Sequence, residues 1–205
     1  MIGIIDYGMG NIGSVLKAFE YLGIKAFVSS SPDELKRAHA LVLPGVGAFG
    51  DAMSNLAKNG LIELLNEEII EKKKPYLGIC LGLQLIFEES EEFGKQKGFG
   101  WVKGKVVKFN LPEGYKIPHM GWNQVWTKGE HPLFDRIPSG TYFYFVHSYY
   151  ASTEEKEFEF ATTDYGVDFT SAVVKDNIVA VQFHPEKSGR IGLRFLNNFF
   201  RWSLR

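Results

Sequence analysis

Four short apolar runs in the first half of the chain, each followed by a segment of helical periodicity, constrain the fold most strongly. The runs cover residues 1–6, 25–28, 40–43 and 75–79. Helices are expected over residues 12–22 behind Asn11 as a possible cap, from Pro32 onward, over 51–73 with a break at 59–60, and over 81–88. Strands that are apolar on both sides and alternate with helices form parallel sheets covered on both faces. The first half therefore predicts an α/β fold with a mostly parallel central sheet and flanking helices.

The pattern changes after about residue 94, where strand signals follow one another with turns between them. Six strands are expected, at residues 102–109, 123–127, 141–146, 157–162, 169–174 and 178–183. A final helix is expected over residues 191–202. The chain has 205 residues, the length of one domain, and shows no internal repeat and no low-complexity linker. We therefore expect a single domain spanning residues 1–205, whose parallel sheet is extended by antiparallel strands.

Composition and charge exclude several classes of function. The formal net charge of −1 offers no basic field for nucleic acid or anionic lipid. The longest apolar runs have four or five residues, far below the ~20 that span a bilayer, and the first residues lack the pattern of a secretory signal. Cys80 is the only cysteine, and no spacing of His, Asp or Glu resembles a metal site. We expect a cytoplasmic protein that binds no membrane or nucleic acid and needs no metal or cofactor.

The segment 78–82, Gly-Ile-Cys-Leu-Gly, lies where an expected strand meets an expected helix. It has the form of a nucleophile elbow with cysteine in place of serine. Flanking glycines permit the sharp turn, and the N-terminus of the following helix favours a thiolate at Cys80. The N–H of Leu81 can point to the oxyanion of a tetrahedral intermediate. A buried structural cysteine between packing glycines is the alternative.

A second signal, Phe-His-Pro-Glu at residues 183–186, follows the last expected strand. His184 and Glu186 are two residues apart, so both side chains leave an extended segment on the same side, and Pro185 favours that conformation. A cysteine nucleophile, a histidine base and a carboxylate that orients the histidine form a catalytic triad. The sequence therefore predicts that Cys80, His184 and Glu186 meet, although His184 could also be an ordinary surface histidine.

Together with the loop Pro-Gly-Val-Gly at residues 44–47, these motifs resemble the triad-type, class I glutamine amidotransferases. The segments 6–11, 117–123 and 144–149 are similar to those of one subfamily, the glutaminase subunits of imidazole glycerol phosphate synthases, and the resemblance covers the whole chain. It implies a flavodoxin-like sheet and a reaction in which Cys80 attacks the carboxamide of glutamine. His184 would move protons between the thiol, the leaving ammonia and water, and Glu186 would orient His184. The N–H of Leu81 and one from Gly45-Val46 would form the oxyanion hole.

The resemblance also implies which residues bind glutamine. Gln84 would bond the substrate, Glu92 would receive its ammonium group, and the main chain of Ser148 and Tyr149 would hold the α-amino-acid end. The alternative is that Gln84 is an ordinary helix residue. Glu92 belongs to an acidic cluster with Glu88, Glu89 and Glu91, which a solvated helix face would also explain.

The partner implied by the resemblance is a cyclase subunit with a (β/α)8 barrel, which would receive ammonia through an interior tunnel. The residues expected to face it are Asn11, Trp122, Tyr144 and Lys187. From their chemistry alone, His119, Met120 and Trp122 would be interpreted as core or surface residues. The run Lys72–Lys74 is interpreted as a solvated helix end, and His39 and His131 as loop residues.

Gly45 suggests how such a partner could control the reaction. Because glycine tolerates φ of either sign, the Gly45–Val46 peptide could turn either an N–H or a carbonyl toward the oxyanion. The isolated chain would then be a weak glutaminase, activated when its partner favours the donating orientation.

Three rival functions remain open at this stage. A glutaminase of another pathway, such as pyridoxal phosphate or anthranilate synthesis, would share the triad but not the subfamily segments. A cysteine peptidase on a similar scaffold would act on peptides without a partner. A non-catalytic regulatory module is a third alternative, against which the intact triad argues.

Overall fold

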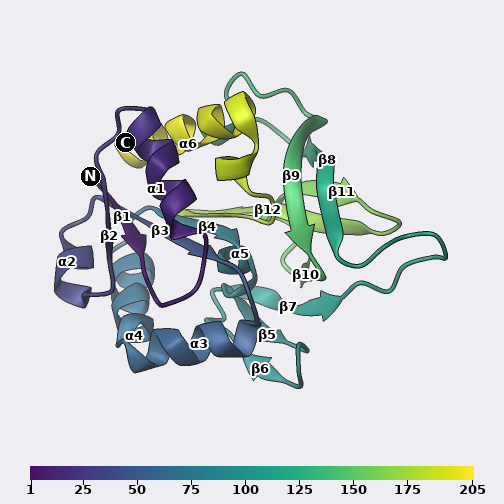
Figure 1. Ribbon diagram of the computed structural model, residues 1–205, viewed down its shortest axis with the longest axis horizontal. Helices are drawn as coiled ribbons and strands as arrows, with labels where there is room; N and C mark the ends of the chain where they lie inside the picture. Colours follow the sequence, from purple (N-terminus) through teal and green to yellow (C-terminus); the bar gives the residue numbers. More distant parts are fainter.

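The computed structural model describes all of residues 1–205 and places five parallel strands at the centre of the molecule (Figure 1). Their order in the sheet is β2-β1-β3-β4-β13. The bounds are β1 Ile2–Ile5, β2 Ala26–Ser29, β3 Ala40–Gly45, β4 Tyr76–Cys80 and β13 Ile178–Val181. Parallel pairing aligns the carboxyl ends of β3, β4 and β13, and Gly45 is the register partner of Cys80. The predicted parallel sheet is confirmed.

Antiparallel strands extend the sheet beyond β13. The path continues through β12 (Asp168–Lys175), β10 (Tyr149–Thr153), β7 (Val102–Lys108), β5 (Phe87–Ser90) and β6 (Gln96–Lys97), with β5 and β7 parallel to each other. A branch leaves β12 through β11 (Glu159–Asp164), β8 (His119–Thr127) and β9 (Thr141–His147). In Figure 1 this branch stands at the end of the molecule away from the N-terminus.

Helices lie on both faces of the parallel strands (Figure 1). One face carries α1 (Ile12–Tyr21) and α6 (Gly189–Ser203); the other carries α2 (Pro32–Lys36), α3 (Phe49–Lys58), α4 (Leu61–Leu65) and the π-helix η1 (Asn66–Glu71). The short α5 (Leu81–Gln84) follows β4, and η2 (Pro132–Phe134) and η3 (Pro185–Lys187) are 3-10 turns. None of the helices is both long enough and apolar enough to span a membrane.

Two hydrophobic cores result from this arrangement, one on each face of the sheet. Neighbouring residues of one strand point to opposite faces. In β3, Val42 packs into the core beneath α1 and α6, whereas Leu41 and Leu43 pack into the core beneath α3 and α4. Both faces are therefore apolar, which explains why these strands show no polar alternation in the sequence.

The structure corrects several predicted boundaries. The helix expected over residues 81–88 ends at Gln84, because Phe87–Ser90 pairs with β7 and β6. The strands β6 and β10 were not predicted, and the strand expected from residue 123 begins at His119. The break at 59–60 is confirmed by a left-handed Gly60. Asn11 precedes α1, but its side chain makes no capping hydrogen bond.

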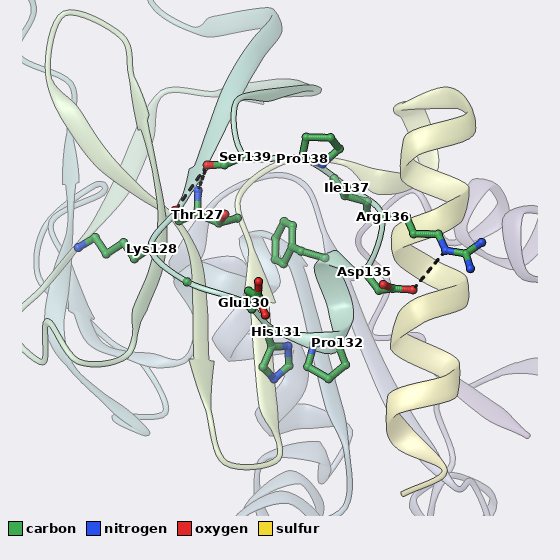
Figure 2. Close-up of a pocket in the computed structure, with 12 residues that line it drawn as sticks. Thr127, Lys128, Glu130, His131, Pro132, Asp135, Arg136, Ile137, Pro138 and Ser139 are labelled. Atoms are coloured by element: carbon green, nitrogen blue, oxygen red, sulfur yellow. Dashed lines mark hydrogen bonds and ion pairs between the residues drawn. The ribbon is translucent and has the colours of Figure 1, made fainter.

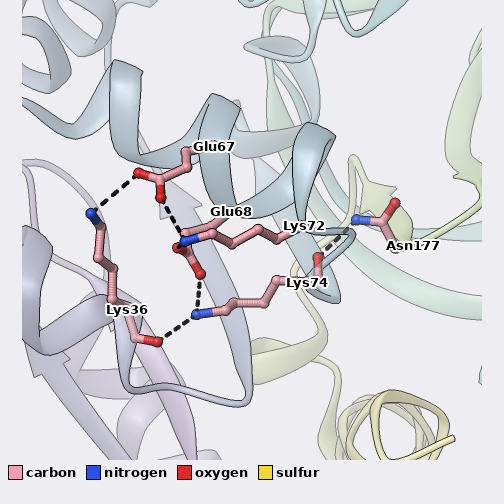
Figure 3. A network of polar contacts seen from close by, with 6 residues as sticks. All are labelled: Lys36, Glu67, Glu68, Lys72, Lys74 and Asn177. Carbon is pink, nitrogen blue, oxygen red and sulfur yellow. Dashed lines mark hydrogen bonds and ion pairs between the residues drawn. The ribbon is translucent and has the colours of Figure 1, made fainter.

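The lysine run at residues 72–74 was expected to be solvated, and this prediction is wrong for Lys74. Figure 3 shows Lys72 and Lys74 both directed at the buried carboxylate of Glu68, with N–O distances of 2.7 and 2.5 Å. Lys74 also donates to the carbonyl of Lys36 at 2.8 Å, and Asn177 donates to the carbonyl of Lys74 at 2.8 Å. The network joins η1 to the segments that precede β4 and β13.

Candidate active site

Cys80 is the last residue of β4, and its backbone conformation makes the sharp turn from this strand into α5. Its φ of 55° and ψ of −105° are rarely adopted by a residue with a side chain, and α5 begins at the next residue. The flanking glycines serve close approach rather than positive φ. A Cβ at Gly78 would overlap the carbonyl of Gly82, and a Cβ at Gly82 would overlap the carbonyl of Leu43. The predicted elbow is confirmed, with the strain placed on the cysteine.

His184 follows β13, the parallel neighbour of β4, and the pairing of Val181 with Ile79 brings it to the elbow. Its Nδ1 lies 2.8 Å from Oε1 of Glu186, and both side chains are 1% exposed. The connecting segment is the 3-10 turn η3 and not the extended chain that the sequence predicted. Because Pro185 is accepted in the first turn of such a helix, the turn still brings the carboxylate to the imidazole.

The charges around His184 change its pKa in a direction that suits acid–base chemistry. Burial alone lowers the pKa of His184, but the negative charges of the Cys80 thiolate and the Glu186 carboxylate raise it to about 10. His184 is therefore an imidazolium at neutral pH. Its Nε2 is buried and has no hydrogen-bond partner of normal geometry, and Cys80 is the neighbouring side chain that acts on this ring.

Two pockets of the molecule are large enough to be candidate sites. The larger, of about 1000 Å³, is formed by one loop between β8 and β9, residues 127–139 (Figure 2). Several of its polar side chains are paired with one another or with a neighbouring strand, Ser139 with Thr127, Arg136 with Asp135 and Lys128 with Glu159, and the pocket contains no cysteine. The smaller, of about 400 Å³, is lined by Cys80 at the ends of the parallel strands. Ligands bind at that edge of α/β sheets, so the smaller pocket is the candidate active site.

The residues expected to form the oxyanion hole lie at this pocket. Leu81 and Val46 line it, and Gly45 pairs with Cys80 in the sheet. In this conformation the residue of the loop with positive φ is Gly47, at 103°, and not Gly45. Gly45 is instead required by packing, since a Cβ there would overlap the hydroxyl of Tyr7. That hydroxyl is buried without a hydrogen-bond partner, a feature that the sequence did not indicate.

The residues expected to bind glutamine also meet in the pocket, which is lined by Gln84, Glu92, Ser148 and Tyr149 among others. Gln84 is buried and donates to the carbonyl of Tyr149 at 2.9 Å, which an ordinary surface helix residue would not do. Glu92 does not lie on a helix face. It follows β5 and accepts a 2.8 Å hydrogen bond from the N–H of Phe49, at the N-terminus of α3.

Gln182 is a site residue that the sequence prediction missed. It is fully buried on the segment after β13, accepts from Gln84 at 3.1 Å and donates to Sγ of Cys80 at 3.6 Å. The only available signal was its place two residues before His184, which is too general to single it out.

Three of the four residues expected at a partner interface form a cluster next to His184 of the triad. Trp122 and Tyr144 are register partners on β8 and β9, with ring centroids 6.2 Å apart, and Lys187 Nζ lies 5.9 Å from the ring of Tyr144. The side chain of Trp122 is 55% exposed. The main-chain carbonyl of Tyr144 accepts from the N–H of His184 at 2.8 Å, which ties this cluster to the triad. Asn11 directly precedes α1, and α1 contacts η3, the turn that carries Lys187.

A cysteine on a strained elbow beside a buried histidine–glutamate pair, at the carboxyl edge of a parallel sheet, is the arrangement of residues that nucleophilic catalysis requires. Residues 3–202 match the family model of the class-I glutamine amidotransferases. The chain belongs to this family, and it is therefore an enzyme.

Curated relatives indicate which subfamily of the glutamine amidotransferases this chain resembles. The chain is 53% identical over 199 residues to imidazole glycerol phosphate synthase subunit HisH of Caldanaerobacter subterraneus, covering 97% of both chains. It is 51% identical to the subunit of the same name in Aquifex aeolicus, covering 97% of this chain and 95% of the relative.

Solved structures agree on the fold. A glutamine amidotransferase crystal structure superposes with a TM-score of 0.76 at 18% identity, covering 100% of this chain and 99% of the other. The PurLQS structure from Thermotoga maritima gives 0.77 at 17% identity, covering 100% and 98%. The predicted fold class is confirmed.

Proposed function

We propose that this chain is the glutaminase subunit of an imidazole glycerol phosphate synthase and supplies ammonia for histidine biosynthesis. The observation that carries the proposal is Cys80, held on its strained elbow beside the buried His184–Glu186 pair. The subfamily is supported by relatives of about half identical sequence over nearly the full chain, which carry the subunit's name.

The reaction begins from the thiolate of Cys80 and the imidazolium of His184. Sγ attacks the side-chain carboxamide carbon of glutamine, and the carbonyl oxygen becomes an oxyanion stabilised by N–H groups of Leu81 and of the Gly45–Val46 peptide. His184 donates its Nε2 proton to the departing nitrogen, so that ammonia leaves and a glutamyl thioester remains. Glu186 accepts from Nδ1 throughout and keeps Nε2 directed at the reacting atoms.

Hydrolysis of the thioester restores the starting state. The neutral His184 takes a proton from water, whose oxygen attacks the thioester carbon. Glutamate leaves, Cys80 becomes a thiolate again and His184 an imidazolium. Gln84, Glu92 and the main chain of Ser148 and Tyr149 hold the α-amino-acid end of glutamine, which orients the carboxamide toward Sγ.

The ammonia receiver in this proposal is a cyclase subunit with a (β/α)8 barrel, in the cytoplasm. It would use the ammonia on a phosphoribulosyl imidazole intermediate to form imidazole glycerol phosphate and an aminoimidazole carboxamide ribotide. The cluster formed by the exposed Trp122 and Lys187 and the half-buried Tyr144 supports docking next to the triad, since an aromatic residue and a cation commonly anchor interfaces.

The test is to mix the purified chain with a candidate barrel subunit and to measure glutamate formed from glutamine, with and without the barrel's phosphorylated ligand. We expect little turnover by the chain alone and a large increase in the liganded complex. Cys80→Ala is the control, and in the complex it should abolish synthesis from glutamine while leaving synthesis from added ammonia. Equal turnover with and without the liganded partner, or hydrolysis of peptides instead of glutamine, would contradict the proposal.

A further inference from the structure

Two buried histidines, His119 on β8 and His147 at the end of β9, contact each other next to the active-site pocket. Nδ1 of His119 lies 2.9 Å from Nε2 of His147, and the two side chains belong to residues that are 3% and 6% exposed. His147 lines the same pocket as Cys80. The triad chemistry uses neither histidine.

The surrounding contacts fix the positions of the protons on both rings. Nδ1 of His147 lies 2.8 Å from the carbonyl of Tyr149, which can only accept, so this nitrogen carries a proton. Burial lowers the pKa of His147 to about 3 and that of His119 to about 4, so both rings are neutral. The Nε2 of His147 therefore accepts, and Nδ1 of His119 donates to it.

Nε2 of His119, the remaining nitrogen of the two rings, extends the chain of hydrogen bonds to Asn123 on β8. Nε2 of His119 is unprotonated and lies 3.2 Å from the side-chain amide of Asn123. The orientation of that amide is independently fixed, because its oxygen accepts from the N–H of Gln124 at 2.8 Å and its nitrogen donates to the carbonyl of Asp164 at 2.8 Å. Every polar atom of the two imidazoles thus has a partner of the right kind.

At the other end the chain reaches the nucleophile. The carbonyl of Tyr149 also accepts from Gln84 at 2.9 Å, Gln84 donates to Gln182 at 3.1 Å, and Gln182 donates to Sγ of Cys80 at 3.6 Å. One continuous set of hydrogen bonds therefore joins Asn123, the neighbour of the exposed Trp122, to Cys80.

We propose that His147 and His119 are positioning residues, which hold the Tyr149 carbonyl and thereby the Gln84 amide in place to bind glutamine. The inference rests on the proposed function, because it assigns the effect to glutamine binding. Aromatic rings enclose the pair, with Phe169 at 5.1 Å and Tyr165 at 4.1 Å between centroids. Phenylalanine side chains would also pack in these surroundings. Only imidazoles, however, can link Asn123 on β8 to the Tyr149 carbonyl through consecutive hydrogen bonds.

The kinetic test uses paired substitutions at one position, measured on the full chain in complex with its partner subunit. His147→Phe removes the donor to Tyr149 and should raise the KM for glutamine about tenfold with little change in kcat, the loss expected for one positioning hydrogen bond. His147→Asn places an amide near the position of Nδ1 and should restore KM to within about twofold of the wild type. Asn123→Ala, at the less buried end, should raise KM by a smaller factor.

Phe169→Leu is the matched control, since it disturbs the packing of both imidazoles without removing a hydrogen bond. We expect it to lower the thermal unfolding temperature and to leave KM unchanged. An increase in KM for Phe169→Leu as large as that for His147→Phe would overturn the proposal, as would an unchanged KM in folded His147→Phe.

A second measurement does not depend on glutaminase activity. Long-range proton–nitrogen NMR spectra at neutral pH should show both rings as neutral tautomers protonated at Nδ1. A proton on Nε2 of either ring would overturn the hydrogen-bond chain, even in a protein that hydrolyses glutamine. If the tautomers are as expected while the wild type does not hydrolyse glutamine, the proposed function fails and the role in glutamine binding fails with it.

Discussion

At the scale of single residues, the site depends on a buried histidine whose positive charge is stabilised by two neighbouring groups, Cys80 and Glu186. Burial lowers the pKa of His184, and this effect is outweighed by the charge of Cys80 in its thiolate form and by the hydrogen-bonded carboxylate of Glu186. His184 is therefore ready to protonate the leaving nitrogen as soon as Sγ attacks.

His184 should matter more for catalysis than Glu186. Replacing His184 with Ala removes the proton donor and should lower kcat for glutamine hydrolysis by about 10³-fold or more. Glu186→Gln keeps the bulk of the side chain and leaves an imidazole in the site, so a smaller loss is expected. Steady-state kinetics of the two variants test this ranking, and a slower Glu186→Gln enzyme would reverse it.

Individual residues also show where sequence reasoning reaches its limit. The motif around Cys80 and the spacing of His184 and Glu186 identified the triad, because local chemistry and local geometry determine both. Gln182 and the unpartnered hydroxyl of Tyr7 were not found, because their neighbours come from distant parts of the chain. The packing requirement at Gly45 was missed for the same reason, because its tightest contact is with Tyr7, 38 positions earlier in the sequence.

At the scale of elements, the elbow requires Gly78 and Gly82 because the backbone of α5 lies directly against the backbones of β4 and β3. Gly82→Ala would place a methyl group on the Leu43 carbonyl and should reduce the free energy of unfolding by about 3 kcal/mol. Gly13→Ala in α1 is the matched control, because nothing lies within 4 Å of its Cβ and it should stabilise by about 0.5–1 kcal/mol. Urea denaturation measures both, and equal stability of the two variants would show that the contact is not limiting.

The parallel half of the fold was predictable from the sequence, and the antiparallel half was predictable only in part. Buried strands and amphipathic helices of the first half show clear periodicity, and all four of these strands were found. The segment 87–90 continues the acidic pattern of a helix, but its pairing with β7 decides its structure. β6 has two residues and β10 follows β9 almost at once, so neither has a local signal of its own.

At the scale of the whole molecule, the buried histidine pair makes stability depend on pH. In the unfolded chain both histidines titrate near their ordinary value of 6.5, whereas their pKa values in the folded protein are about 4 and about 3. The unfolded state therefore binds more protons as pH falls below 6.5, and stability is lost in that direction, by about 1.4 kcal/mol per pH unit for each histidine. Urea denaturation between pH 7 and pH 5 should show this loss, with a shallower slope for His119→Gln. Equal slopes for the two proteins would contradict the assignment.

A substitution of Trp122 tests how this chain binds its partner subunit. With its side chain largely exposed, Trp122→Ala should weaken partner binding or activation by the partner while changing thermal stability little. Titration calorimetry with the barrel subunit and thermal unfolding of the free chain give the two quantities. A variant that unfolds readily would show that Trp122 serves the core instead.

The central claim, that Cys80 carries a glutamyl group during turnover, is tested most directly by trapping that group. The complex with its partner and phosphorylated ligand is mixed with glutamine, quenched in acid within one turnover and analysed by intact-protein and peptide mass spectrometry. The account predicts a mass increase of one glutamyl group on the peptide that contains Cys80, in the wild type and not in Cys80→Ala. Glutamate formation at the full rate by Cys80→Ala, or a glutamyl group on any other residue, would contradict it.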